Sequence, residues 1–139
     1  MIRLCTLSAD DTVYGSKGDD IIYGNEGSDT IYAGNGNDFV YGGAGNDIID
    51  GGEGNGLLYG GFGDDTYIFG KNCGTDVIND TEGTSVIKLT NEVSLADLRI
   101  DSVGEDVVIS IRDTDDKLII TDFKQNPDNY VLRIGDEEI

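Results

Sequence analysis

The sequence predicts an all-β protein in which a flattened solenoid of parallel coils is followed by antiparallel strands. A nine-residue pattern repeats in phase from Gly15 onward. Glycine occurs 21 times in 139 residues, and it is concentrated in this region, where it disfavours helix. After about Lys71 the pattern gives way to alternating apolar and polar residues, which are typical of strands. We therefore expect a repeat domain over residues 8–70 and a capping β domain over residues 71–139.

The repeat region divides into six copies, which read GSKGDDIIY, GNEGSDTIY, AGNGNDFVY, GGAGNDIID, GGEGNGLLY and GGFGDDTYI. Glycine holds the fourth position of every copy. Aspartate holds the sixth position except in the fifth copy, where Gly56 replaces it. The eighth position is always large and apolar, with Ile22, Ile31, Val40, Ile49, Leu58 and Tyr67. Each copy thus alternates a turn with a short strand whose middle residue faces inward.

Stacking of the copies supplies a core that a single copy cannot form. Each copy contributes its one inward apolar residue to a shared column. If one coil takes two copies, turns two copies apart stack at the strand spacing of about 4.8 Å. The sixth-position residues then form two columns, one of Asp11, Asp29, Asp47 and Asp65, and one of Asp20 and Asp38, where Gly56 interrupts the series.

The repeat region carries an excess of negative charge, which we expect a bound cation to neutralise. Residues 10–70 carry twelve acidic side chains and one base, Lys17. Two carboxylates at this spacing repel each other by about 1 kcal/mol in water and by several times more when partly buried. The available donors are carboxylates, asparagine amide oxygens and turn carbonyls. An all-oxygen set in a flexible backbone suits Ca²⁺ better than Mg²⁺ or transition metals.

Composition excludes several other classes of function. The formal net charge of -19 excludes nucleic-acid binding through a basic face. Histidine is absent, and Cys5 and Cys73 are best interpreted as two free thiols. No set of nucleophile, base and orienting residue can be assembled, so we expect no enzyme activity. No apolar run reaches the roughly 20 residues of a membrane span.

The six copies resemble the GGxGxDxUx nonapeptide of the RTX (repeats-in-toxin) family. The stretch SLADLRIDSVGEDVVISIRDTDDKLIITDF, with NYVLRIGDEEI after it, is similar to the haemolysin-type calcium-binding-related domain that follows such blocks. The resemblance implies a right-handed parallel β-roll that binds about three to five Ca²⁺ ions between turns one coil apart.

In that family each ion takes the second- and fourth-position carbonyls and the aspartate of one turn. The next turn on the same side gives its first- and third-position carbonyls and its own aspartate. The resemblance thus implies one site at Ser16, Gly18, Asp20, Ala33, Asn35 and Asp38, a second at Asn25, Gly27, Asp29, Gly42, Ala44 and Asp47, and a third at Gly43, Gly45, Asp47, Gly60, Phe62 and Asp65. A degenerate leading turn adds a fourth, with Leu7, Ala9, Asp11, Gly24, Glu26 and Asp29.

A further pair of turns lacks its second aspartate because of Gly56. It would use Gly34, Gly36, Asp38, Gly51 and Glu53. We expect this site to be weak or empty unless water or a nearby acid completes it.

The second half shows ordinary strand patterning. We expect strands at 77–78, 86–89, 106–111, 117–121 and 130–134, and one short helical turn capped by Ser94. The stretch from Arg112 to Asp116 has the composition of a solvated turn. Antiparallel strands here would cover the open end of the solenoid and protect its edge.

The resemblance also implies a function. The chain would be a calcium-responsive folding module of a larger bacterial toxin, exoenzyme or adhesin. That parent protein would be exported by the type I secretion machinery and act outside the cell or on its surface. The alternative is an adhesion or carbohydrate-contacting accessory module of an adhesin or an exported polysaccharide-modifying enzyme. The outward tyrosines at positions 14, 23, 32, 41 and 59 would be its platform, although cross-strand stacking explains them more simply.

Overall fold

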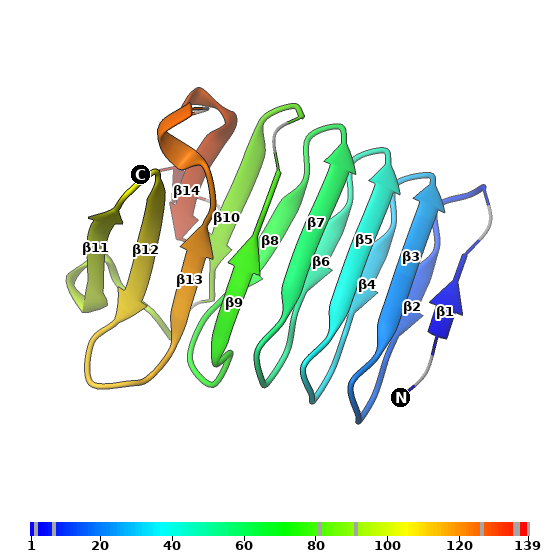
Figure 1. The fold of residues 1–139 in the computed structure, drawn as a ribbon, viewed down its shortest axis with the longest axis horizontal. Coiled ribbons are helices and arrows are strands. Elements are labelled where there is room, and N and C mark those ends of the chain that lie inside the picture. The colour runs from blue at the N-terminus through cyan, green and yellow to red at the C-terminus, as the bar shows by residue number, and fades with distance from the viewer. Residues whose placement is uncertain are drawn as a thin grey trace.

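The protein is a stack of two β-sheets that lie one behind the other (Figure 1). The computed structural model describes residues 1, 3–6, 8–80, 82–90, 92–125, 127–134 and 137–138. The chain passes from one sheet to the other at each turn, so each coil adds one strand to each of the two sheets. The predicted all-β solenoid with antiparallel strands at its end is therefore confirmed.

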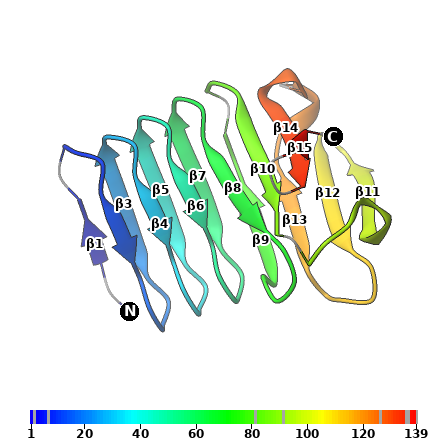
Figure 2. The same cartoon turned by 180° about the vertical axis from the view of Figure 1, so that it is seen from behind.

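The first sheet has eight strands, in the spatial order β1 (Arg3–Cys5), β3 (Ile21–Glu26), β5 (Phe39–Ala44), β7 (Leu57–Phe62), β9 (Thr75–Ile78), β13 (Lys117–Ile120), β12 (Asp106–Ile111) and β11 (Leu98–Val103). The second has seven, in the order β15 (Glu137–Glu138), β14 (Tyr130–Ile134), β10 (Ser85–Leu89), β8 (Thr66–Phe69), β6 (Ile48–Asp50), β4 (Thr30–Tyr32) and β2 (Thr12–Tyr14). Figure 2 shows the stack from behind.

The register follows the repeat. Ile22 pairs with Val40 and Val40 pairs with Leu58, so parallel neighbours in the first sheet are 18 residues apart. The second sheet has the same offset, since Ile31 pairs with Ile49. One coil therefore takes two copies of the repeat, as the sequence predicted.

The core lies between the two sheets. The predicted inward residues Ile22, Ile31, Val40, Ile49, Leu58 and Tyr67 are all buried. The core continues beyond the repeats through side chains such as Phe69, Ile78, Ile87 and Leu118. In the three-residue strands β2, β4 and β6 only the middle residue is buried, because successive side chains point to opposite faces.

The solenoid does not stop at Lys71. Strand β9 pairs in parallel with β7, and β10 pairs in parallel with β8. Beyond them β13 and β14 also add in parallel, to β9 and β10. The antiparallel pairs are confined to β11–β12, β12–β13 and β14–β15. The expectation of purely antiparallel capping strands is thus wrong for β9, β10, β13 and β14, and the division into domains at residue 70 stays a prediction.

A longer coil explains why the repeat pattern of the sequence does not reveal these additional parallel strands. Leu58 pairs with Ile78, twenty residues later, so two extra residues in the coil shift the repeat out of phase while the strands stay in register. Leu98–Val103 also forms a strand that the sequence did not predict. It follows the helical turn η1 (Leu95–Asp97), which Ser94 caps as predicted.

Two further short helical turns, η2 (Phe123–Gln125) and η3 (Pro127–Asn129), connect β13 to β14. All three helical elements are single turns. Among the described residues, no helix has the length and hydropathy needed to cross a bilayer.

Candidate metal centre

The sixth-position aspartates form the two predicted columns. Oδ1 of each accepts the backbone N–H of the sixth residue one coil earlier, at 2.8 Å, in the pairs Asp29–Asp11, Asp47–Asp29, Asp65–Asp47 and Asp38–Asp20. Each carboxylate therefore leans back across the gap between two coils. One of its oxygens is used to hold the previous turn.

The second carboxylate oxygen is buried in five of the aspartates that hold a neighbouring coil. Oδ2 accepts no hydrogen bond from the described residues at Asp29, Asp38, Asp47, Asp65 and Asp76. Burial raises the pKa of all five carboxyls, to about 6 for Asp47 and about 7 for Asp76, and neighbouring aspartates raise it further. A buried acceptor without a donor costs about 1–3 kcal/mol, and more when it is charged. These oxygens therefore favour a cation in the gaps.

Glycine leaves room for carbonyls beside these carboxylates. A Cβ at Gly24 would lie 2.2 Å from the Gly42 carbonyl oxygen and 2.6 Å from Oδ2 of Asp29. A Cβ at Gly42 would meet Oδ2 of Asp47 at 2.4 Å and the Gly60 carbonyl at 2.6 Å. In both places a first-position carbonyl and a carboxylate converge on the same small space.

The predicted first site has the same arrangement. A Cβ at Gly15 would lie 2.1 Å from the Ala33 carbonyl oxygen and 3.1 Å from Oδ2 of Asp20. The structure thus brings together an aspartate and a first-position carbonyl in each of the first three predicted sites.

The other predicted carbonyls hold the coils to one another. The second-position carbonyl of Ser16 accepts the N–H of Asn35 at 2.7 Å. The third-position carbonyls of Asn35, Ala44 and Phe62 accept the N–H groups of Gly18, Gly27 and Gly45 at 2.8–2.9 Å. A carbonyl oxygen has two lone pairs, so these bonds leave one acceptor direction available on each oxygen.

The predicted fourth site has only part of this arrangement. Leu7 lies outside the described residues. The Ala9 carbonyl points at Gly27, as the repeat requires, and Asp29 accepts the N–H of Asp11. The Thr6 hydroxyl donates a hydrogen bond to the Gly24 carbonyl, which was a predicted ligand. A protein donor therefore already occupies one of the six positions.

The fifth-position side chains form a ladder that the sequence analysis missed. Each accepts the backbone N–H of the fifth-position residue in the next coil, so they point the opposite way from the aspartate columns. The acceptor–donor pairs are Asp10–Ser28, Asp19–Asn37, Ser28–Asn46, Asn37–Asn55, Asn46–Asp64, Asn55–Thr75 and Asp64–Thr84. The signal was present, because every copy has Asp, Asn or Ser at this position.

Three aspartates of the second half join these columns. Asp76 accepts the N–H of Gly56 at 2.8 Å and so continues the Asp20–Asp38 column past the missing aspartate. Asp80 accepts hydrogen bonds from the Tyr67 and Ser85 hydroxyls beside Asp65. The prediction of a solvated turn is wrong at Asp116, which is buried.

Asp116 ends the column on the Gly56 side. Its carboxylate accepts the N–H groups of Asn72 and Gly74 at 3.0 and 2.9 Å. In the repeats the fourth-position N–H donates instead to a carbonyl of the next coil. No further repeat turn follows here, so the Asp116 carboxylate replaces that carbonyl.

The two cysteines lie apart from the aspartate columns in chemistry, since neither forms a disulfide. Both are free, Cys5 exposed and Cys73 buried. Burial raises the pKa of the Cys73 thiol to about 11, so it is not a thiolate at neutral pH. Among the described residues, no three His, Cys, Asp or Glu side chains gather as a metal cage. A cation held by these residues would therefore need backbone carbonyls as well as aspartate pairs.

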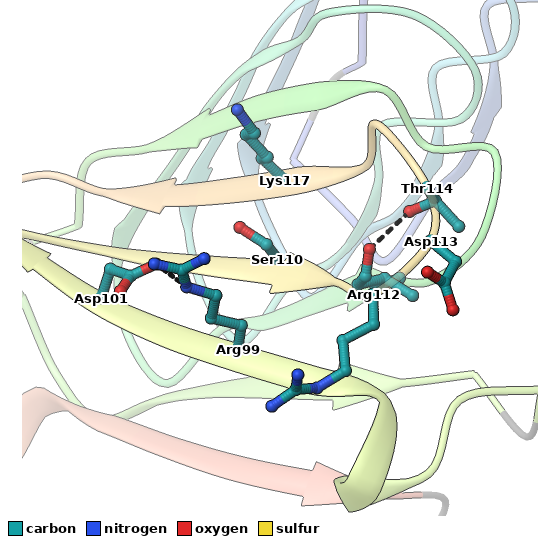
Figure 3. Close-up of a pocket in the computed structure, with 8 residues that line it drawn as sticks. Arg99, Asp101, Ser110, Arg112, Asp113, Thr114 and Lys117 are labelled. Atoms are coloured by element: carbon teal, nitrogen blue, oxygen red, sulfur yellow. Dashed lines mark hydrogen bonds and ion pairs between the residues drawn. The ribbon is translucent and has the colours of Figure 1, made fainter.

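A separate pocket of about 640 Å³ lies on the β11–β12–β13 face (Figure 3). Arg99 pairs with Ser110, and Ser110 pairs with Lys117, so two bases lie in one row across three strands. Arg112 lines the same pocket from the turn after β12. Arg99 and Asp101 form an exposed ion pair at 2.9 Å.

The comparison with protein families agrees with the repeat analysis. The family model for the RTX calcium-binding nonapeptide repeat (4 copies) matches residues 7–40, 23–58 and 41–71. No curated protein is similar enough to count as a relative. Among solved structures, the solution structure of the AlgE6R2 subunit from the Azotobacter vinelandii mannuronan C5-epimerase is 20% identical, with a TM-score of 0.38. The match covers 96% of this chain and 94% of that chain. Residues 7–71 of this chain are therefore a block of RTX calcium-binding nonapeptide repeats.

Proposed function

We propose that this chain is a non-catalytic module that folds when Ca²⁺ binds between its coils. The observation that carries the proposal is the row of buried Oδ2 atoms without hydrogen-bond partners at Asp29, Asp38, Asp47 and Asp65. Calcium supplies a divalent positive charge that accepts oxygen ligands from flexible turns. Its binding free energy would become folding free energy, because the gaps exist only when the coils are stacked.

The ligand sets follow from the convergence of carboxylates and carbonyls. We assign sites to the three gaps Asp20–Asp38, Asp29–Asp47 and Asp47–Asp65, with the turn carbonyls that flank each gap. The Asp11–Asp29 gap is a weaker candidate because its leading turn is degenerate, and the Thr6 hydroxyl already uses one lone pair of the Gly24 carbonyl. The role of the protein is to present these oxygens at the strand spacing and to exclude water from Oδ2.

The negative charge of the module favours an extended chain when calcium is absent. A chain of net charge -19 resists compaction, and the repeat region holds twelve of its acids against one base. Weak sites stay empty at the low calcium concentration of a cytosol and fill at the millimolar concentration outside a cell. We therefore propose an extracellular or cell-surface location and export in an extended form as part of a larger protein.

A calcium titration followed by far-UV circular dichroism tests the proposal. We expect a disordered calcium-free state, a cooperative gain of β structure with Ca²⁺ and little response to equal Mg²⁺. A chelator-treated sample as compact and heat-resistant as the calcium-loaded protein would overturn the proposal.

One observation favours a second candidate, a module that contacts an acidic carbohydrate. Three of the nine bases, Arg99, Arg112 and Lys117, line a single pocket with two acids, Asp101 and Asp113, which leaves one excess positive charge there. The tyrosines favour it less, because Tyr14 and Tyr32 stack on each other with centroids 5.2 Å apart, and Tyr23 contacts Tyr41 at 6.5 Å. These contacts support cross-strand stiffening. Binding of a polyuronate but not of a neutral glucan, lost in Arg112→Gln, would support this second candidate.

A further inference from the structure

We propose that a further divalent cation binds between the turn Gly51–Gly56 and the turn Lys71–Asp76, with carboxylates from Asp76 and Asp50. The site rests on the proposed function. It differs from the repeat sites because one of its turns lies beyond the matched repeats, and because Gly56 supplies no carboxylate.

The turn Lys71–Asp76 has the backbone of a repeat turn. Its second and fourth positions, Asn72 and Gly74, have φ of 67° and 71°, and the corresponding repeat residues also have positive φ. Its fifth position, Thr75, donates its N–H to Asn55 at 3.0 Å, as the fifth-position ladder requires. The Gly54 carbonyl points at Gly74, 2.1 Å from where a Cβ would lie. A further gap of the repeat type therefore exists here.

Asp76 presents an oxygen to this gap. The residue is only 1% exposed, and Oδ1 accepts the N–H of Gly56. Oδ2 has no hydrogen-bond partner among the described residues. It lies 3.1 Å from the position that a Cβ on Gly51 would occupy, so it points into the space that this glycine leaves open.

Asp50 replaces the carboxylate that Gly56 lacks. The ninth position is Tyr or Ile in the other five copies and Asp only here. Asp50 directly precedes Gly51, and one of its oxygens accepts the N–H of Gly52 at 2.9 Å. The pKa of Asp76 is raised chiefly by burial, and among the neighbouring carboxylates Asp50 raises it most, ahead of Asp38 and Asp116. The two unusual residues, Gly56 and Asp50, therefore flank the same turn.

The column that contains Asp65 ends in a gap where protein hydroxyl groups donate hydrogen bonds to a carboxylate. There Ser85 stands at the sixth position, and Oδ2 of Asp80 accepts hydrogen bonds from the Tyr67 hydroxyl at 2.9 Å and the Ser85 hydroxyl at 2.6 Å. Asp76 has no such donors on Oδ2. A carboxylate that served only to cap Gly56 would be expected to have its second oxygen satisfied or hydrated. The contrast favours a cation at Asp76.

Ion counting tests the site in the intact chain. Native mass spectrometry at saturating Ca²⁺ gives the number of ions, and isothermal titration calorimetry gives their affinities. We expect Asp76→Asn to bind one ion fewer than the wild type. We expect Asp50→Asn to weaken one ion at least tenfold and leave the others unchanged. The matched control Asp115→Asn removes the same charge from an exposed turn residue and should change neither quantity.

The outcomes separate this site from the proposed function. A wild-type count retained by folded Asp76→Asn overturns the site but leaves the function standing. A wild-type protein that binds no Ca²⁺ overturns both. If circular dichroism shows that Asp76→Asn does not fold in Ca²⁺, Asp50→Asn decides: a weakened ion supports the site, and unchanged binding overturns it.

Discussion

Asp47 uses one carboxylate oxygen to hold the backbone N–H of Asp29 at 2.8 Å and keeps the other buried without a hydrogen-bond partner. The first oxygen fixes the spacing of two coils, and the second points into the gap between them. The same residue therefore serves the stacking of the solenoid and the proposed cation site.

Asp47→Asn separates these two roles, because asparagine keeps an oxygen for the Asp29 N–H but loses the charge. Asp47 borders two proposed sites, whereas Asp20 borders one. We expect Asp47→Asn to raise the Ca²⁺ midpoint of folding by at least about tenfold, or about 1.4 kcal/mol, and Asp20→Asn to raise it less. The midpoint is measured by circular dichroism.

Asp64→Asn is the control for this prediction. Asp64 lies on the fifth-position ladder, where Asn46 and Asn55 accept the same kind of backbone N–H hydrogen bond through an amide oxygen. Its substitution should move the midpoint little. Equal shifts for Asp47→Asn and Asp64→Asn would show that the midpoint follows net charge rather than cation contact.

Acid should partly replace calcium. In the folded chain the pKa of Asp47 is raised to about 6 and that of Asp76 to about 7, above the ordinary value of 3.8, chiefly by burial. A group whose pKa is higher in the folded state stabilises the fold below its unfolded pKa. That stability is lost as the pH rises through the folded pKa. The calcium-free protein should therefore gain β structure below about pH 4 and lose it between about pH 4 and 7.

Circular dichroism in the presence of EDTA checks the pH dependence, at low protein concentration because the isoelectric point is about 4.1. Because protons and Ca²⁺ both stabilise the folded chain, the Ca²⁺ concentration needed for half-folding should fall as the pH falls below 7, while fewer ions bind to each folded chain. A calcium-free protein that becomes more ordered with increasing pH would contradict this account of the carboxylates.

The repeat region could be predicted well because its signal is periodic. A coil of 18 residues follows from six copies in phase, and it fixes both the parallel register and the aspartate columns. The inward residues follow from the two-residue period of a strand. The first three sites could be located in this way, although their ligand sets came from a family resemblance.

The contributions of the second half could not be predicted in the same way. Asp76 reaches the Gly56 position only because two extra residues lengthen the coil, which shifts the pattern from a period of 18 to 20. Asp116 reaches Gly74 across 42 residues of sequence, and no local pattern encodes a contact of that range. The turn motif Gly74-Thr75-Asp76 was the one available signal.

The Tyr67 hydroxyl should matter for stability and not for ion binding. It accepts the N–H of Gly60 at 2.6 Å and donates to Oδ2 of Asp80 at 2.9 Å, inside the core. Tyr67→Phe leaves the Gly60 N–H without its partner and removes one donor from Asp80. We expect a loss of about 1–3 kcal/mol in the free energy of unfolding at saturating Ca²⁺, with the same ion count.

Tyr14→Phe provides the comparison, since Tyr14 is 67% exposed and its ring stacks on Tyr32 without needing the hydroxyl. Urea unfolding of the two variants side by side measures the difference. Equal stabilities would show that the Tyr67–Asp80 hydrogen bond contributes nothing beyond what the core already provides.

The close approach of neighbouring coils at glycine is the last feature that substitution can test. Gly45 has φ of 133°, and a Cβ there would lie 2.1 Å from the Gly27 carbonyl oxygen of the previous coil. Gly104 also has positive φ, at 62°, but a Cβ there would meet no atom within 4 Å.

Gly104→Ala should therefore cost about 1 kcal/mol through backbone strain alone. Gly45→Ala adds a backbone clash that only separation of the coils relieves, so we expect ~3 kcal/mol or more and a weaker response to Ca²⁺. Urea unfolding at saturating Ca²⁺ measures both costs. Similar losses for the two variants would mean that the coils can move apart at little expense, and the tight spacing on which the carboxylate and carbonyl geometry depends would not be enforced by glycine.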